Sequence, residues 1–276
     1  MADDFFSEAQ QKALALAQQF DRESPVTITA VVGASGPSGG KAPAEQEWTL
    51  RFDLIAWKVD DGPLHQGLLK VCKKVGDAEL RQFQQALKPE SLIRLTVKLA
   101  EENPFGTPQA LLLSLDGEAH DAALQSVLDE YVKPCTLDDP DFGTLILDRR
   151  LDWFETQADW RGQAVKLRIG VEDLSETAAA IATARTLWRD MATWSERIRQ
   201  FAVESLLPLK NDSWLDDDED EVTAAEFLQK MALIAITVYP DQHFEFWHRD
   251  GDLFWGHAIL VSGSIEEGPT EADIPG

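Results

Sequence analysis

The sequence contains only two cysteines, Cys72 and Cys135, and neither stands in a C-x-x-C pair. Two isolated thiols provide neither a disulfide framework nor a thiol-based zinc site, so we expect a reducing compartment. The sequence also lacks any apolar run of about 18 residues, and no basic region precedes an apolar stretch at its N-terminus. These absences predict a cytoplasmic protein that neither spans nor binds a membrane.

Positive charge is scarce, because 25 Lys and Arg residues stand against 49 Asp and Glu residues and give a net charge of −24. Such a surface repels phosphate backbones, so we predict no nucleic-acid partner. The same charge could attract a basic protein partner. No G-x-S-x-G, H-E-x-x-H or dinucleotide-binding motif is present, so the sequence indicates no catalytic residues and no cofactor.

Hydrophobic residues make up 44% of the sequence and include nine tryptophans, so we expect a folded protein. A length of 276 residues favours two domains. Pro134 ends a helix predicted at 118–133, and an Asp- and Pro-rich stretch follows it. We therefore place the domains at 1–133 and 134–276. The second domain has 29 acidic and 12 basic residues, a net of −17, which leaves −7 for the first.

The N-terminal domain is predicted to begin with an amphipathic helix at 5–20, with an apolar stripe of Phe6, Ala9, Ala13, Leu14, Ala17 and Phe20. This helix either docks on the domain or serves as a partner-binding arm. A Gly-, Pro- and Ser-rich loop at 33–47 resembles a phosphate-binding loop. Ser35 and Ala42, however, replace a required glycine and hydroxyl of the G-x-x-x-x-G-K-[ST] motif, so we reject that site.

The rest of this domain is predicted to be mainly β-structure. Leu50, Phe52 and Leu54 alternate along one strand, which is typical of a sheet with one buried side. Three strands, a helix and two strands are the element order of an OB-type barrel. We therefore predict an α+β protein whose first domain is an OB-like barrel or half-barrel, with strands at 26–32, 48–59, 65–72, 91–100 and 109–115 and a helix at 77–87.

The C-terminal domain is predicted to be antiparallel β-structure packed with helices. A first meander has strands at 143–148, 151–157 and 163–169, and Arg161-Gly162 forms its second turn. Two helices follow at about 174–193 and 194–207. The acidic run 216–221 lacks the ligand spacing and glycine of a calcium loop, so we interpret it as a solvated linker. Thr223 and Glu226 then form a capping box that begins a helix at 223–230.

A second meander is predicted from the strand at 232–239 and a terminal hairpin. Asp250-Gly251 is a strong two-residue turn signal, and it pairs 243–248 with 253–257. This register separates His243 from His248 and His257, so we predict no metal site. His257 is a buried core histidine or a base with a lowered pKa, and Trp255 and His257 form a candidate pocket.

Several segments resemble a bacterial domain-of-unknown-function family, number 2262. They are FGTLILDRRLDWFE, WSERIRQFAVESLL, YPDQHFEFWHRDGDLFWGHAILVSG and GPTEADIPG, and they occur in this order within residues 134–276. The most specific is DGDLFWGH at 250–257. The resemblance implies kinship and brings no reaction, cofactor or catalytic residue.

The favoured hypothesis is a non-catalytic protein-binding protein, of which an acidic immunity-type inhibitor is one form. Its candidate contact residues flank the first hairpin of the second domain and are Asp152, Trp153, Asp159 and Trp160. The two tryptophans can equally well pack in the core. The alternatives are a small-ligand-binding regulatory module with an aromatic pocket, or an enzyme with a site between the two domains.

Overall fold

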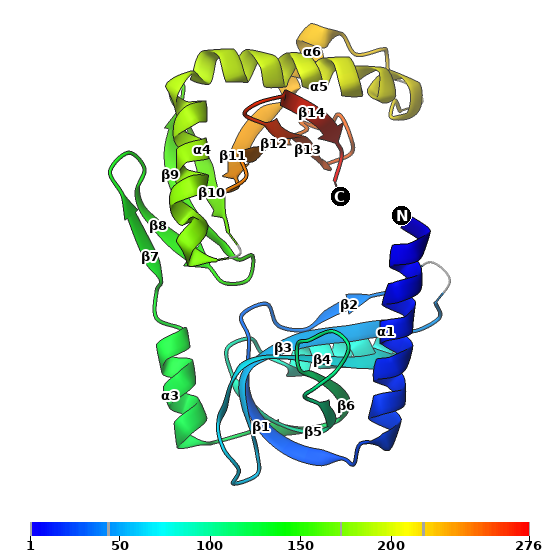
Figure 1. Cartoon of the computed structure of the whole chain (residues 1–276). Coiled ribbons are helices and arrows are strands. Elements are labelled where there is room, and N and C mark those ends of the chain that lie inside the picture. The colour runs from blue at the N-terminus through cyan, green and yellow to red at the C-terminus, as the bar shows by residue number, and fades with distance from the viewer. Residues whose placement is uncertain (1, 43–44, 172, 217–218, 276) are drawn as a thin grey trace. The chain divides into compact units, whose positions relative to one another are not determined.

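In a computed structural model the described residues are 2–42, 45–171, 173–216 and 219–275 (Figure 1). The chain divides into two units, Met1–Lys133 and Pro134–Gly276. The first unit is a small β-barrel with helices, and the second is an eight-stranded sheet covered by helices. The predicted α+β fold class, with an OB-like first domain, is therefore confirmed.

Five strands of the N-terminal domain form a closed barrel, because β1 pairs with both β5 and β3. Alternate residues of β3, among them Leu50, Phe52 and Leu54, are buried inside it, as the sequence pattern predicts. The elements of this domain are α1 (Ala2–Arg22), β1 (Val26–Val32), β2 (Ser38–Gly40), β3 (Trp48–Val59), β4 (His65–Val75), α2 (Asp77–Ala86), β5 (Leu92–Ala100), β6 (Gln109–Glu118) and α3 (Ala122–Tyr131).

Helix α1 docks on the barrel, which selects the first of its two predicted roles. Leu16 and Phe20 pack on Ala100, and Lys98 Nζ donates to the Phe20 carbonyl oxygen at 2.7 Å. The predicted apolar stripe is partly wrong, because Leu14 is 61% exposed and Leu16 takes the buried position. The docked face is therefore rotated from the face that hydrophobic spacing alone suggests.

The C-terminal domain is built on a sheet with the order β14-β13-β12-β11-β10-β9-β8-β7. Neighbouring strands are antiparallel except β10 and β11, which pair in parallel and join the two meanders. The elements are β7 (Thr136–Asp139), β8 (Gly143–Asp148), β9 (Trp153–Trp160), β10 (Gln163–Gly170), a 3-10 helix (Leu174–Glu176), α4 (Thr177–Arg189), α5 (Met191–Ser213), α6 (Ala224–Lys230), β11 (Ala232–Val238), β12 (His243–Arg249), β13 (Ala258–Ser264) and β14 (Gly268–Asp273).

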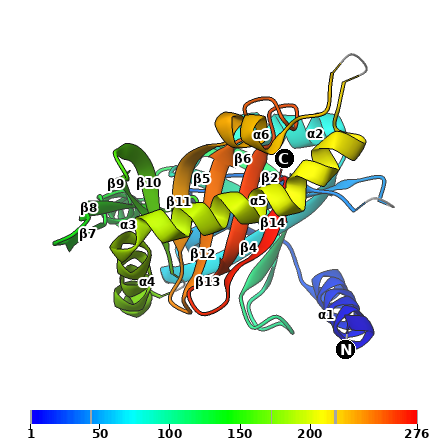
Figure 2. The same ribbon diagram turned by 90° about the horizontal axis from the view of Figure 1, so that it is seen from above.

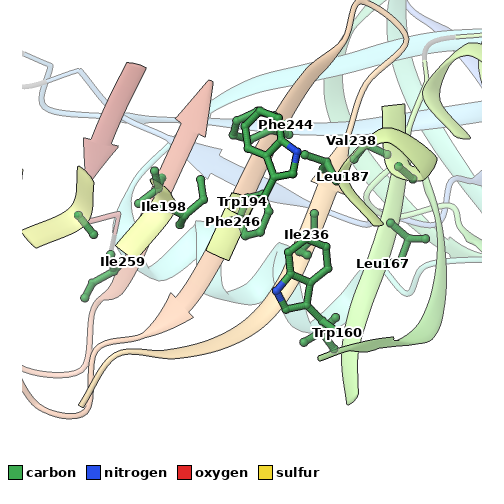
Figure 3. Packing of buried hydrophobic residues seen from close by; sticks show 14 of the residues in the cluster. Trp160, Leu167, Leu187, Trp194, Ile198, Ile236, Val238, Phe244, Phe246 and Ile259 are labelled. Atoms are coloured by element: carbon green, nitrogen blue, oxygen red, sulfur yellow. The ribbon is translucent and has the colours of Figure 1, made fainter. Parts of the chain in front are cut away.

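Helices α4 and α5 cover one face of this sheet, and α5 runs across the strands (Figure 2). The core between them is rich in aromatic rings. Trp194 of α5 meets Phe244 edge to face at 5.2 Å between ring centroids, and Phe244 meets Phe246 in the same way (Figure 3). Ile198 is buried one turn further along α5. This core holds α5 at a fixed position over the sheet.

The predicted terminal hairpin is wrong in its register. Arg249 pairs with Ala258 and His248 with Ile259, so the turn spans residues 250–257 and is not the two-residue Asp250-Gly251 turn. The Asp250 carboxylate accepts hydrogen bonds from backbone amides within the turn. Leu253 is fully buried, so the chain after Gly251 enters the core and does not begin a strand.

The acidic run 216–221 joins α5 to α6, and Asp216, Asp220 and Glu221 are exposed, as expected of a solvated linker; residues 217–218 lie outside the described residues. Glu219 and the residues that flank the run are nevertheless anchored to α5. Lys210, which is fully buried, donates to the Glu219 carboxylate at 2.6 Å and to the Trp214 carbonyl oxygen at 2.7 Å. Asn211 bonds the backbone of Val222 through both its amide nitrogen and its oxygen. Helix α5 carries both of these anchoring residues because it continues through Pro208 to Ser213, beyond its predicted end at 207.

Two short strands were not predicted, because their segments have no clear alternation of apolar and polar residues. Strand β2 falls within the predicted loop at 33–47, and β7 falls within the Asp- and Pro-rich stretch after Pro134. The helix predicted at 118–133 begins at Ala122, because Asp121 caps it by accepting from the Ala123 and Leu124 amides.

Candidate ligand-binding cleft

A cleft of about 380 Å³ opens in the C-terminal domain where α5 and α6 meet the ends of strands β9 to β12. Its volume lies within the range of small-ligand sites, roughly 300–1,000 Å³. Much of its wall is apolar and consists of Trp160, Ile198, Leu228, Met231, Ala232, Leu233 and Phe246. The cleft can therefore shield the body of a small molecule from water.

The polar part of the wall contains cationic and neutral groups, namely Arg161, Gln163, Ser195, Arg199, Gln229 and His248. Among the described residues no Asp or Glu lines the cleft. This is unusual in a chain with 49 acidic residues. The electrostatic environment inside the cleft is thus opposite in sign to the net charge of the protein.

Trp160 forms one wall and is held in place by its neighbours. Its indole Nε1 donates to Ser195 Oγ at 2.9 Å, and its ring meets Trp188 edge to face. The ring meets Phe246 in the same way (Figure 3). Only 4% of the residue is exposed. Because Ser195 accepts from the indole, its own hydroxyl proton remains available to a ligand.

Arg161 occupies the first position of the two-residue turn between β9 and β10. The predicted Arg161-Gly162 turn is confirmed, since Trp160 pairs with Gln163 and both turn residues have positive φ, 58° and 85°. Asn, Asp or Gly is normally favoured there. A left-handed conformation costs an arginine about 1 kcal/mol, so we infer that the side chain of Arg161 has a function that offsets this cost.

Arg199 lies one helical turn after Ser195 on α5, and both residues line the cleft because residues four apart share a helix face. Ile198 beside them is buried and anchors the helix to the sheet. Among the described residues neither Arg161 nor Arg199 has an ion-pair or hydrogen-bond partner. Gln163, in contrast, is fixed, since its Nε2 donates to the Leu233 carbonyl oxygen at 2.7 Å.

His248 lies at the base of the cleft and is 4% exposed. Its Nδ1 is buried and has no hydrogen-bond partner among the described residues. The pKa of His248 is lowered to about 4, chiefly by burial and to a smaller extent by the positive charge of Arg199, while backbone contacts with Ile259 and Phe246 raise it in part. The imidazole is therefore neutral at physiological pH, and Nδ1 is a polar group that the protein leaves unsatisfied.

The structure does not bring the four predicted contact residues together. Trp160 is buried in the cleft, and Asp159 is exposed and accepts from the Gly162 amide at 3.1 Å. Asp152 and Trp153 lie at the other end of β9, seven residues away or roughly 23 Å along a strand. They line a separate cavity of about 450 Å³, where Arg168 lies over the Trp153 ring at 4.4 Å.

The predicted pocket residues Trp255 and His257 lie in the turn at 250–257 and do not line the cleft around His248. Trp255 is 60% exposed, has φ of 55° and lies against Trp214 at 4.7 Å between ring centroids. His257 meets Trp214 edge to face, and its Nδ1 is buried without a partner among the described residues. These contacts show a packed aromatic cluster around Trp214.

Sequence reasoning missed Arg161, Ser195 and Arg199 as site residues, and it considered His248 only as a member of a metal or acid–base site. Two signals were present. Ser195 and Arg199 share a helix face with spacing of four, and an arginine occupies a turn position that favours Asn or Gly. In the described part of the chain no three His, Cys, Asp or Glu side chains are grouped to hold a metal ion. No described helix is long and apolar enough to cross a membrane.

Comparison with known families accounts for both domains. Residues 139–274 match the family described as "Uncharacterized protein conserved in bacteria (DUF2262)", and this match covers nearly all of the C-terminal domain. The C-terminal domain belongs to this family. Residues 12–131 match a second domain of unknown function, DUF7021. The predicted kinship is thus confirmed, and the cleft around His248 lies within the DUF2262 domain.

The chain also matches solved structures at low similarity. The small single-stranded DNA-binding protein from Streptomyces coelicolor is 14% identical, with a TM-score of 0.23, and the match covers 37% of this chain and 95% of that one. A replication protein A heterotrimer bound to ssDNA is 13% identical, with a TM-score of 0.29 and coverage of 54% and 39%. A single-stranded DNA-binding protein from Thermus aquaticus is 12% identical, with a TM-score of 0.25 and coverage of 56% and 77%. At these scores the likenesses carry no functional argument, and no curated protein matches the chain.

The prediction on partners, which excluded nucleic acid because of net charge, is wrong as stated. Proteins that bind single-stranded DNA are among the structures that the chain matches. Net charge averages over the whole surface, whereas binding depends on local charge. Residues 62–75 of the barrel contain Lys70, Lys73 and Lys74 and no Asp or Glu, although Lys73 and Lys74 form ion pairs with Glu79 and Glu45. Charge alone therefore does not decide the class of partner.

Proposed function

We propose that the DUF2262 domain is a small-ligand-binding module and that its ligand occupies the cleft around His248. The observation that carries this proposal is the unsatisfied Nδ1 of His248 at the base of a cleft with an apolar wall. Buried polar groups in native proteins almost always have a partner, and one without a protein partner calls for a bound molecule or a specific role. A ligand with one polar group at this depth would satisfy it.

The fixed surroundings support the same proposal. Trp160, Ser195 and Gln163 are held by hydrogen bonds that do not involve a ligand. The cleft is therefore largely preformed, and binding would not have to order these side chains. The two free cysteines fit the proposed cytoplasmic location, where thiols stay reduced.

The test is a screen of small molecules against the full chain, with the histidine side chains labelled with ¹⁵N. The chain has five histidines, so each ring can be followed separately. We expect compounds that raise the Tm to shift the ring signals of His248 and to lose this effect in His248→Leu. His243→Leu is the matched control, because His243 lies at the other end of β12 and is exposed. Compounds that bind without shifting His248 would contradict the proposal.

Protein binding, the role favoured by the sequence, is retained as a second candidate because of Trp255. This tryptophan is 60% exposed in a strained conformation that buried Asp250 supports, and exposed Trp residues are frequent at the centre of interfaces. A partner that the full chain binds should be lost in Trp255→Ser and kept in Leu174→Ser, which changes another exposed apolar side chain. Equal loss in both variants would argue against a specific role of Trp255.

A further inference from the structure

If the proposed function is right, the two arginines that line the cleft around His248 indicate which class of small molecule it binds. Arg161 and Arg199 line the same cleft, and neither has a partner among the described residues. Two other arginines of this domain, Arg168 and Arg185, form ion pairs with Glu155 and Asp139. Two guanidinium groups with no carboxylate beside them, in a strongly acidic protein, form a site for negative charge.

The two arginines are presented by rigid elements. Arg161 stands in the tight turn between β9 and β10, and Arg199 stands on α5, which Ile198 and Trp194 anchor to the sheet. The hydroxyl of Ser195, on the same face of α5, adds a neutral donor. Preformed donors of this kind lose little entropy when an oxyanion binds.

The remaining surface describes the rest of the ligand. Below the arginines the wall is formed by Phe246, Met231 and Trp160, and the neutral imidazole of His248 closes the base. Since His248 carries no charge at neutral pH, the arginines alone provide the positive charge. We infer that the DUF2262 cleft binds a small amphipathic anion, whose carboxylate or phosphate contacts Arg161 and Arg199 and whose apolar body extends toward His248.

The experiment titrates the full chain by calorimetry with benzoate, phenyl phosphate and the neutral isostere benzamide. We expect saturable binding of at least one of the two anions and binding at least about tenfold weaker for benzamide, since a neutral amide cannot form charge-assisted hydrogen bonds with the two arginines. The stronger of the two anions identifies carboxylate or phosphate as the preferred group.

Two variants keep the test independent of folding. Arg161→Gly removes the guanidinium and places at the turn a residue that favours positive φ, so the Tm should stay the same or rise while anion affinity falls about tenfold. Arg199→Gln should weaken binding similarly, and Arg189→Gln, at the exposed end of α4, should not. Equal affinity for benzoate and benzamide, affinity unchanged in both cleft variants, or no saturable anion binding at millimolar concentration would overturn the inference.

These outcomes separate the inference from the proposed function. A neutral compound that shifts the His248 ring and binds Arg161→Gly as well as the wild type would leave the cleft a ligand site and exclude the anion. Anion binding that depends on both arginines but leaves the His248 ring unchanged would instead place the ligand at the mouth only, against the proposed depth of the site.

Discussion

The buried imidazole of His248 makes the stability of the C-terminal domain dependent on pH in a predictable direction. The pKa of His248 is about 4 in the folded protein, because burial disfavours the charged form, and about 6.5 in the unfolded chain. Between these values the unfolded state holds a proton that the folded state does not. Stability is therefore complete above pH 6.5 and falls as the pH drops toward 4.

The magnitude follows from the two pKa values. Lowering the pH from 7 to 5 should cost about 2 kcal/mol of unfolding free energy through this one group. The assay is urea unfolding followed by tryptophan fluorescence, which mainly reports the C-terminal domain because only Trp48 and Trp57 lie in the other. The wild type and His248→Gln are compared at both pH values.

Only the difference between the two pH dependences matters, so the absolute stability of the variant does not affect the result. His248→Gln should lose about 2 kcal/mol less than the wild type between pH 7 and pH 5. The carboxylates titrate equally in both proteins and cancel in the comparison. Identical pH dependence would show that the imidazole is protonated or hydrated in the folded state, and it would refute the burial argument.

Contacts at three places in the C-terminal domain, around Lys210, Asp250 and Gly263, are tested by urea unfolding at pH 7. Lys210→Met should lower the free energy of unfolding by about 1 kcal/mol, because the Glu219 side chain is 28% exposed and can be rehydrated. Glu219→Ala leaves the buried ammonium of Lys210 without its carboxylate and should lower it by about 3 kcal/mol. The reverse order of the two losses would contradict this reasoning. Asp250→Ala leaves two backbone amides without their acceptor and should cost about 2–3 kcal/mol, with Asp250→Asn losing about half as much. Gly263→Ala would drive a methyl group into a carbonyl oxygen of the paired strand β14 and should cost more than about 2 kcal/mol. The control is Gly76→Ala in the N-terminal domain, where the added methyl group meets nothing within 4 Å and should leave the stability of both domains unchanged.

Two turns show how far the sequence could predict this fold. Arg161-Gly162 and Asp250-Gly251 both carry the signal of a two-residue hairpin, and only the first forms one. At the second, Leu253 is buried in the core and Asp250 bonds amides of the longer turn. Local turn chemistry therefore yields to tertiary burial, which no short-range pattern contains.

The same limit applies to the cleft. Element order predicted the barrel, because strand and helix signals are local. The cleft instead depends on side chains from separate elements, and the relevant residue types were individually ordinary. Ser195 and Arg199 were predicted to lie on one helix, but their position opposite Arg161 depends on how α5 crosses the sheet. The anchoring of Glu219 within the acidic run 216–221 was missed for a similar reason, since the charge pattern does not reveal its buried partner Lys210.

The parallel pairing between β10 and β11 is the one such pairing among the described strands of the C-terminal domain, and it has a consequence for how this domain folds. The chain leaves β10 at Gly170 and returns at Ala232, so the two meanders are sequence-distant halves, and their pairing must close the long intervening segment. Trp160 comes from the first half and His248 from the second. The cleft therefore does not exist in either half alone. A ligand can bind only after β10 and β11 have paired, so its binding would show that this long-range pairing has formed. A ligand bound in the cleft would contact both meanders and stabilise their β10–β11 pairing against separation.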